Sequence, residues 1–200
     1  MDVLDTINTR TMVREYDSTP LKEEEKTKIL ESAIRAPTAA GNEQWIFVRA
    51  DTNQKMSQLY KLLVEAQSVY FSEMLAKPWD EQRVEQWLGK AYLGAFKAPF
   101  YVMVFVDLRE HFCTRPPIEE FWAQQSVAAA IENMLLAAWG MGIGGCWYGV
   151  PLLIDAGFYE LAGMDKDKMK LAAVLGFGYP KEKQEPRPRR KGLKDVVISI

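Results

Sequence analysis

The most constraining feature of this chain is an unbroken apolar run, Phe-Tyr-Val-Met-Val-Phe-Val, at residues 100–106. A run without polar alternation is typical of a strand covered on both faces, because a half-exposed strand alternates apolar and polar side chains. Such a strand needs a sheet with helices packed against each side. The sequence therefore predicts a layered fold built from helices and strands.

Further segments complete this pattern. Thr19 followed by Pro20 is typical of a helix N-cap with proline at the first helical position, and that helix should end before Pro37. Apolar periodicity predicts helices over 2–9, 54–74, 119–139 and 155–162, a mostly helical segment over 77–98, and strands at 45–48 and 171–177.

The end of the chain is predicted to behave differently from the rest. Residues 181–194 are basic, contain prolines and lack a core pattern, and residues 196–198 then return to strand character. An unpaired terminal strand is a liability, so we expect it to pair with a second subunit. Residues 1–200 are thus predicted to form one domain in which 181–200 are an extended C-terminal arm.

Composition excludes several classes of protein. The 200 residues are 48% apolar and carry a net charge of −2, which predicts a globular chain without a field that attracts nucleic acid or an anionic membrane. One histidine and two cysteines supply neither a zinc site nor a disulfide scaffold, so no metal site is expected. The apolar stretch 127–150 contains Glu132, Asn133 and five glycines, which favours a buried helix and a turn over a membrane span. The N-terminus lacks a signal-peptide pattern, and a cytoplasmic location is expected.

Two basic segments are candidates for binding an anion. Arg10 and Arg14 flank the hydroxyl of Thr11, which suits a phosphate group, although two solvated surface arginines would give the same pattern. The cluster 187–191 on the tail could also bind phosphate. Nucleic acid is disfavoured as its ligand, because the rest of the chain offers no basic face.

Two loops rich in small residues are candidates for contacting a flat ligand. Loop 37–44 carries the amides of Asn42 and Gln44, which suit a planar heterocycle, or it is an ordinary helix-to-strand connection. Glycines between 140 and 149 expose backbone N–H groups, or else they cap the preceding helix. Cys146 is interpreted as a small buried residue rather than a nucleophile.

Five motifs in order along the chain resemble those of the nitroreductase family of FMN-dependent oxidoreductases. They are Arg10-Thr11-Met12-Val13-Arg14-Glu15-Tyr16, the stretch Ala36-Pro37-Thr38-Ala39-Ala40-Gly41-Asn42-Glu43-Gln44-Trp45, Ala98-Pro99 before an apolar strand, the helix 130–138 leading into 142–147, and Leu175-Gly176-Phe177-Gly178-Tyr179-Pro180 with arginines after it. Met12 stands where the family usually has Ser, and Ser126 stands where many members have Asp. The order and spacing of the motifs make the resemblance specific over nearly the full length.

The resemblance implies a homodimeric α+β sandwich of three layers, with a mainly antiparallel sheet, a C-terminal strand exchanged with the partner subunit, and two FMN sites at the interface. It places Arg14 at the flavin pyrimidine edge, where positive charge stabilises the anion that forms at N1 on reduction. The other implied contacts are Arg10, Thr11 and Met12 to phosphate and ribityl; Pro37, Thr38, Ala39, Asn42 and Gln44 to ring and ribityl; the backbone N–H groups of Tyr148 and Gly149 to N5 and O4; and Arg189 and Arg190 to phosphate, with Arg187 as the alternative.

The implied activity is a ping-pong transfer, in which NADH or NADPH gives hydride to flavin N5 and an electron-poor nitroaromatic, quinone or enone then takes it. Because the cofactor carries the chemistry, no catalytic side chain is assigned. Four aromatic residues are candidates for the acceptor side, or else for packing: Phe71, Trp79, Phe112 and Phe121. Three alternatives stay open: reductive dehalogenation or flavin fragmentation on the same scaffold, flavin binding with little turnover, and RNA binding through the tail.

Overall fold

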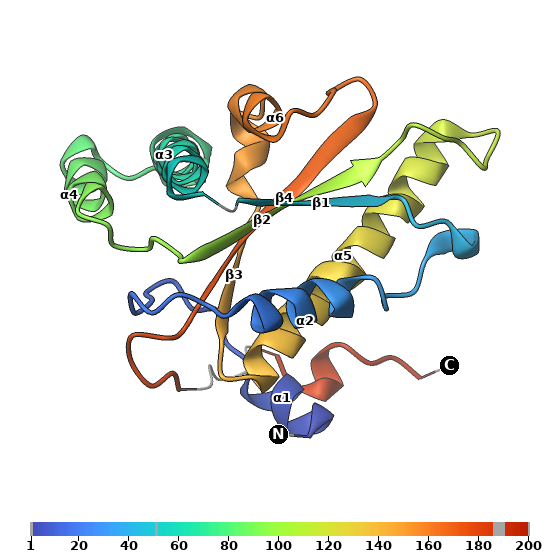
Figure 1. Cartoon of the computed structure of the whole chain (residues 1–200), viewed down its shortest axis with the longest axis horizontal. Coiled ribbons are helices and arrows are strands. Elements are labelled where there is room, and N and C mark those ends of the chain that lie inside the picture. Colours follow the sequence, from blue (N-terminus) through green and yellow to red (C-terminus); the bar gives the residue numbers. More distant parts are fainter. Residues whose placement is uncertain (1, 51, 186–190, 200) are drawn as a thin grey trace.

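A computed structural model describes residues 2–50, 52–185 and 191–199 of the chain. A four-stranded antiparallel sheet forms its centre, in the order β1-β2-β4-β3 (Figure 1). The strands are β1 (Trp45–Ala50), β2 (Phe100–Asp107), β3 (Gly144–Tyr148) and β4 (Met169–Gly178). The predicted central strand at 100–106 is therefore confirmed as β2, with a neighbour on each side.

Helices cover both faces of this sheet (Figure 1). The helices α3 (Asn53–Val69) and α6 (Ala156–Ala162) lie on one face, with α4 (Glu81–Tyr92) beyond α3. The helices α2 (Glu23–Ala33) and α5 (Pro116–Gly140) lie on the other face, and the short α1 (Val3–Thr9) sits at the end of α5. The predicted three-layer α+β architecture is confirmed.

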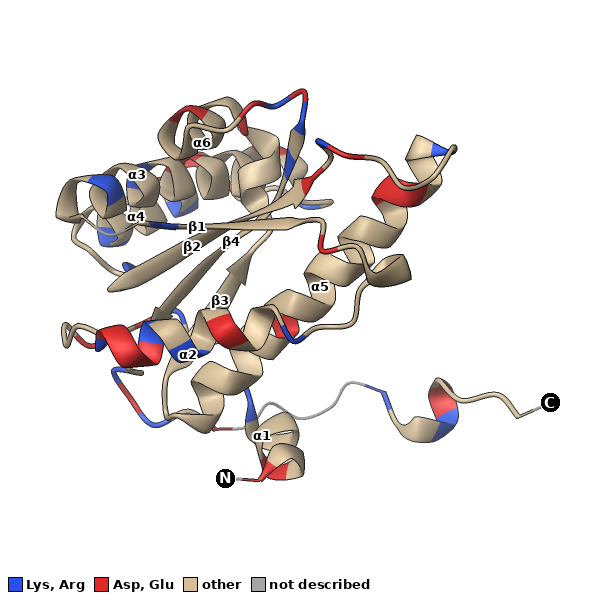
Figure 2. Cartoon of the chain, turned by 45° about the vertical axis from the view of Figure 1, so that its right-hand side comes forward, with Lys and Arg blue, Asp and Glu red and all other residues tan. Residues whose placement is uncertain are grey.

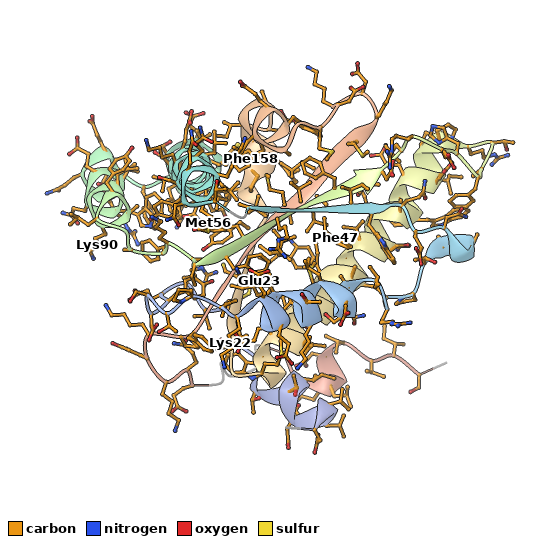
Figure 3. The ribbon with its side chains drawn as sticks, in the orientation of Figure 1. Lys22, Glu23, Phe47, Met56, Lys90 and Phe158 are labelled. Carbon is orange, nitrogen blue, oxygen red and sulfur yellow. The ribbon has the colours of Figure 1, made fainter. Side chains whose placement is uncertain are left out.

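The side chains of β2 alternate between two hydrophobic cores, because successive residues of a strand point to opposite faces. Phe100, Val102, Val104 and Val106 join the core under α2 and α5, and Tyr101, Met103 and Phe105 join the core under α3 and α6. Figure 3 shows Phe158 and Met56 on the α3 and α6 side of the sheet, and Phe47 on the α5 side. Burying one such side chain stabilises the fold by roughly 1.5–3 kcal/mol, so this strand anchors both layers.

The start of α2 differs from the prediction. The helix begins at Glu23 with Lys22 as the N-cap residue, not at Pro20 after Thr19. The Asp17 carboxylate accepts the backbone N–H of Thr19 at 2.5 Å, and this local turn holds the chain out of the helix. Acidic residues fill the first turn of α2, where they complement the helix dipole.

The C-terminal arm also differs from the prediction. Residues 193–195 form a 3₁₀ turn and 196–198 are exposed, so no strand forms there in the described part of a single chain. Strand exchange with a second subunit stays a prediction. Among the described residues, no helix combines the length and apolar character that crossing a membrane requires.

Candidate functional site

The segment that follows α1 lies along the free edge of β3. Met12 forms a parallel bridge with Gly145, and the backbone N–H of Val13 donates to the Gly145 carbonyl at 3.1 Å. A Cβ atom at Gly144 would lie 2.5 Å from Val13 Cβ, so only glycine permits this approach. Tyr16 continues the segment as a bridge partner of Pro180. Residues 12 and 13 thus bridge the edge of β3, and residues 15–17 pair with 179–181 just beyond β4.

The two arginines of this segment differ in what they contact. Arg10 Nε lies 3.3 Å from a Glu132 carboxylate oxygen on α5. Arg14 is exposed and makes no hydrogen bond or ion pair with any residue that the structure describes. Burial raises the pKa of the Cys146 thiol, and the nearby Arg14 charge lowers it in part. The guanidinium of Arg14 is therefore available to a ligand, while Cys146 stays a neutral, buried thiol.

At the end of β3 the backbone is exposed, whereas the adjacent side chain is buried. Gly149 is exposed, and a Cβ placed on it would meet nothing within 4 Å. The Tyr148 side chain instead enters the core under α3 and α6, where its hydroxyl has no hydrogen-bond partner among the described residues. A ligand at this end of β3 would meet the backbone rather than the tyrosine ring.

Loop 37–44 is held against α5 rather than against β3. Ala40 and Gly41 take left-handed conformations with φ of 51° and 76°. The backbone N–H of Ala39 donates to the Ser126 hydroxyl at 3.2 Å, so Ser126 anchors the loop to α5. Pro37 and Thr38 remain at least partly accessible.

The two amides of this loop are already engaged within the protein. The buried Gln44 side chain donates from Nε2 to Glu119 Oε1 at 2.9 Å. Asn42 donates from Nδ2 to the Ala40 carbonyl at 3.3 Å. A cavity of about 450 Å³ adjoins the loop and is lined by Asn42, Glu43, Gln44, Asp107, Arg109 and Glu110. Gln44 is thus an internal anchor, which sequence reasoning missed.

Within one chain, the predicted cofactor residues of segment 10–14 and those of loop 37–44 contact α5 at different places. Arg10 contacts α5 at Glu132, whereas Ala39 contacts it at Ser126. Six residues of helix correspond to about 9 Å along the axis and about 120° around it. The predicted contacts Arg187, Arg189 and Arg190 lie outside the described residues.

The four aromatic candidates also fall into two separate groups. Phe71 and Trp79 stack at 4.0 Å between ring centroids, and the Arg83 guanidinium lies 4.1 Å from the Trp79 ring. Phe112 stacks on Trp122 at 6.4 Å between ring centroids, and Phe121, the residue before Trp122 on α5, is exposed. Figure 1 shows the first group, by α4, and the second, at the start of α5, at opposite ends of the molecule.

Sequence reasoning also missed two basic residues, Lys90 and Lys181, that share a cavity with Glu15 and Tyr16. A cavity of about 370 Å³ is lined by Glu15, Tyr16, Lys90, Leu93, Gly94, Ala95, Phe96 and Lys181. Figure 3 labels Lys90 on α4. These residues come from three distant stretches of the chain, and no local pattern connects them.

Comparison with known proteins gives consistent results. The model of the nitroreductase family matches residues 7–179. YfhC of Bacillus subtilis, which carries the provisional name NAD(P)H nitroreductase, is 26% identical over 185 residues, covering 92% of this chain and 88% of YfhC. An iodotyrosine deiodinase of Daphnia pulex is 26% identical over 196 residues, covering 96% of this chain and 64% of the deiodinase.

Solved structures share the fold. The crystal structure of a Bacteroides fragilis nitroreductase with bound FMN superposes with a TM-score of 0.69 at 24% identity, and the match covers 100% of both chains.

Proposed function

The chain belongs to the nitroreductase family, and on that premise we propose that it is an FMN-dependent oxidoreductase. Its reductant would be NADH or NADPH, and its acceptor an electron-poor nitroaromatic, quinone or enone. The observation that carries the proposal is the exposed Arg14 guanidinium, which pairs with no described residue, in the segment that bridges β3, the strand that ends next to the open backbone of Gly149.

The residues on this edge suit FMN. The cofactor has an anionic phosphate, a polar ribityl chain and a flat ring system, and when bound it supplies the hydride transfer between nucleotide and acceptor. Arg14 would place a positive charge where negative charge develops on the ring. The backbone N–H groups of Tyr148 and of the exposed Gly149 would donate to the ring edge. Thr11 and Met12 would line the ribityl chain.

Arginines from two parts of the chain would neutralise the phosphate of FMN. Arg10 would bind the phosphate while it also contacts Glu132. Arg189 and Arg190, with Arg187 as the alternative, would complete the neutralisation from the C-terminal arm. Charge-assisted hydrogen bonds of this kind are each worth about 1.5–3 kcal/mol.

A second copy of the chain would complete the site. Loop 37–44 and the β3 edge face different parts of α5 in one chain, so we propose a homodimer in which the Pro37, Thr38, Ala39 and Asn42 contacts come from the partner. Exposed large apolar side chains support such an interface, because a second copy of the chain can bury them. They include Val3, Leu4, Ile7, Phe121, Val196 and Ile198.

The test is the visible spectrum of the purified protein, before and after anaerobic addition of NADH or NADPH. Flavin bands that bleach with either nucleotide and return with a nitroarene or quinone are expected. Flavin bands that persist would point to flavin binding with little turnover. Absence of flavin after incubation with FMN would refute the proposal.

An arginine variant tests the site itself. Arg14→Ala should weaken FMN affinity or slow flavin reduction by roughly ten- to a hundredfold, because a charge-assisted contact is lost. Lys166→Ala, which removes a cation from the exposed turn after α6, serves as the control. Equal affinity and equal reduction rate in both variants would show that the flavin does not lie along β3.

Reductive dehalogenation is a second candidate, because the match to the Daphnia pulex deiodinase spans nearly the whole chain. Halide release from an iodinated phenol under anaerobic conditions with a chemical reductant would measure it. Turnover with the halogenated phenol that exceeds turnover with nitroarenes and quinones would favour this chemistry.

A further inference from the structure

We propose that Glu119 is a positioning residue that holds loop 37–44 and loop 108–115 in one fixed arrangement at the edge of the acceptor site. The inference rests on the proposed function, in which loop 37–44 contacts the flavin, and on Phe112 of loop 108–115 as a candidate for the acceptor side. It assigns a role to the one acidic side chain in the described chain whose exposed fraction is 0%.

The carboxylate of Glu119 joins three separate segments. Oε1 accepts hydrogen bonds from Gln44 Nε2 at 2.9 Å and from the backbone N–H of Phe112 at 3.1 Å. Oε2 accepts the backbone N–H of Cys113 at 3.3 Å and lies 3.2 Å from His111 Nδ1. One side chain on α5 therefore ties the end of loop 37–44 to the middle of loop 108–115, and it reinforces a longer direct contact in which Gln44 Nε2 donates to the Glu110 carbonyl at 3.4 Å.

This contact needs a charged carboxylate. Burial raises the pKa of Glu119, but the N–H of Phe112, the amide of Gln44 and His111 lower it, and the net shift is downward. Glu119 also lies in the first turns of α5, where the helix dipole favours negative charge. Figure 2 shows this acidic band at the start of α5, next to the loop. An ionised carboxylate offers enough lone pairs for all four donors.

Nearby charges do not compete for the contact. Arg109 is held by Asp107, with its Nη2 at 2.6 Å from Oδ2, and Glu120 is held by Lys170 at 2.6 Å. The half-exposed ring of His111 is the one titratable partner that faces Glu119 among the described residues. The four donors are therefore the groups that lose a partner when Glu119 is changed.

Other contacts keep the fold when this one is lost. Ala39 stays bonded to Ser126, and the Gln44 carbonyl still accepts the backbone N–H of Asp107 at 3.1 Å. The cavity of about 450 Å³ lies between the two loops, with Asn42 and Gln44 on one side and Arg109 and Glu110 on the other. Loss of Glu119 should therefore change the shape of this cavity without unfolding the sheet.

The primary variant is Glu119→Gln, with Glu120→Gln as the matched control. Glutamine keeps the size but retains one acceptor oxygen and turns an N–H₂ group toward backbone donors. Glu120 is the next residue on α5 and makes its contacts at the surface. Hydrogen exchange of the two loops, FMN affinity and the separate values of kcat and KM for a quinone are measured for both variants and the wild type.

Glu119→Gln should speed amide exchange at least tenfold in both 37–44 and 108–115, while β2 keeps its protection. FMN affinity should fall by about tenfold, and KM for the quinone should rise more than kcat falls. Glu120→Gln should match the wild type in all of these. A loss of stability alone would lower protection everywhere and would not separate KM from kcat.

Gln44→Met keeps the proposal testable if Glu119→Gln does not fold. It removes the Gln44 contacts with Glu119 and with the Glu110 carbonyl and leaves the other three donors on Glu119. The backbone N–H groups of Phe112 and Cys113 keep their acceptor, so faster exchange is expected mainly in 37–44, with FMN affinity several-fold weaker. Unchanged exchange of 37–44 in both variants, or faster exchange with unchanged FMN affinity and KM, would overturn the inference. A wild-type protein that binds no FMN would instead overturn the proposed function itself.

Discussion

Two buried tyrosines differ in a single hydrogen bond. Tyr101 on β2 accepts the backbone N–H of Ala98 at 2.8 Å, whereas the Tyr148 hydroxyl on β3 has no described partner. Burial raises the pKa of both hydroxyls, so both stay neutral. A buried hydroxyl without a hydrogen-bond partner costs free energy. Removing that hydroxyl therefore need not destabilise the protein, whereas removing a bonded hydroxyl does.

We expect Tyr101→Phe to lower the free energy of unfolding by about 1–3 kcal/mol, because it leaves the Ala98 N–H unpaired. Tyr148→Phe should be neutral or slightly stabilising. Urea denaturation of both variants against the wild type measures this difference. An equal cost for the two substitutions would mean that the Tyr148 hydroxyl is satisfied in solution.

The roles of single residues were only partly predictable. Residue type alone marks Asn42 and Gln44 as candidate ligand contacts, because amides both donate and accept hydrogen bonds. The partner of Gln44 is not readable from residue type, because Glu119 lies 75 positions away along the chain. A polar residue at the start of an apolar helix was the available signal for Glu119, and it does not reveal what the carboxylate contacts.

At the scale of elements, the approach of residues 12–16 to β3 depends on glycine. Gly144→Ala should push Val13 away and lower the free energy of unfolding by about 1–3 kcal/mol, since its Cβ would overlap Val13. It should also weaken FMN binding. Gly89→Ala in α4 meets nothing within 4 Å and should be neutral or stabilising by up to about 1 kcal/mol.

Thermal unfolding and FMN titration of the two alanine variants provide the comparison. If Gly144→Ala kept both the stability and the FMN affinity of the wild type, the N-terminal segment would not be fixed on β3 in the way the structure describes.

The start of α5 should respond to acid through Glu119. The pKa of this carboxyl is lowered in the fold, so its contribution to stability is complete above its ordinary value of 4.5. That contribution is lost as the pH falls below 4.5 through the folded pKa. The difference in stability between wild type and Glu119→Gln should therefore be constant at neutral pH and shrink toward pH 3.

Urea unfolding at several pH values between 3 and 7 measures this difference. A difference in the free energy of unfolding between wild type and Glu119→Gln that stays constant down to pH 3 would show that folding does not lower the pKa of Glu119.

Most elements were predictable because their patterns are local. Continuous apolar runs indicated β2 and β4, and helical periodicity indicated α3 and α5. The start of α2 was wrong, since the Asp17 turn competes with a proline signal three residues before the helix. β3 was missed, because its glycines, which admit Val13 and Leu135, have low strand propensity.

At the scale of the whole molecule, the exposed apolar arm predicts an assembly. We expect a mass near twice 22.8 kDa by light scattering. Val197→Asp with Ile198→Asp should shift the protein toward the monomer, because charges would replace exposed apolar side chains of the arm. Tyr92→Asp with Leu93→Asp, an exposed pair at the end of α4, should leave the mass unchanged.

A monomer in the wild type, or equal effects of the two pairs of substitutions, would contradict the arm as the contact between subunits.

The division of the candidate site into two groups could not be foreseen from the residues alone. It depends on where α5 carries Ser126 and Glu132, which is a property of packing and not of spacing along the chain.

The strand order has a consequence for synthesis. β2, the most apolar segment, pairs on one side with β1, which precedes it, and on the other with β4, so that Phe100 meets Phe177. On the ribosome, one edge of β2 therefore waits unpaired while α5, β3 and α6 are made. Non-local pairing of this kind is slow, and it leaves an unpaired strand edge that can associate with other chains. We expect newly made chains to depend on a chaperone, or on slow translation, until residue 178 has emerged.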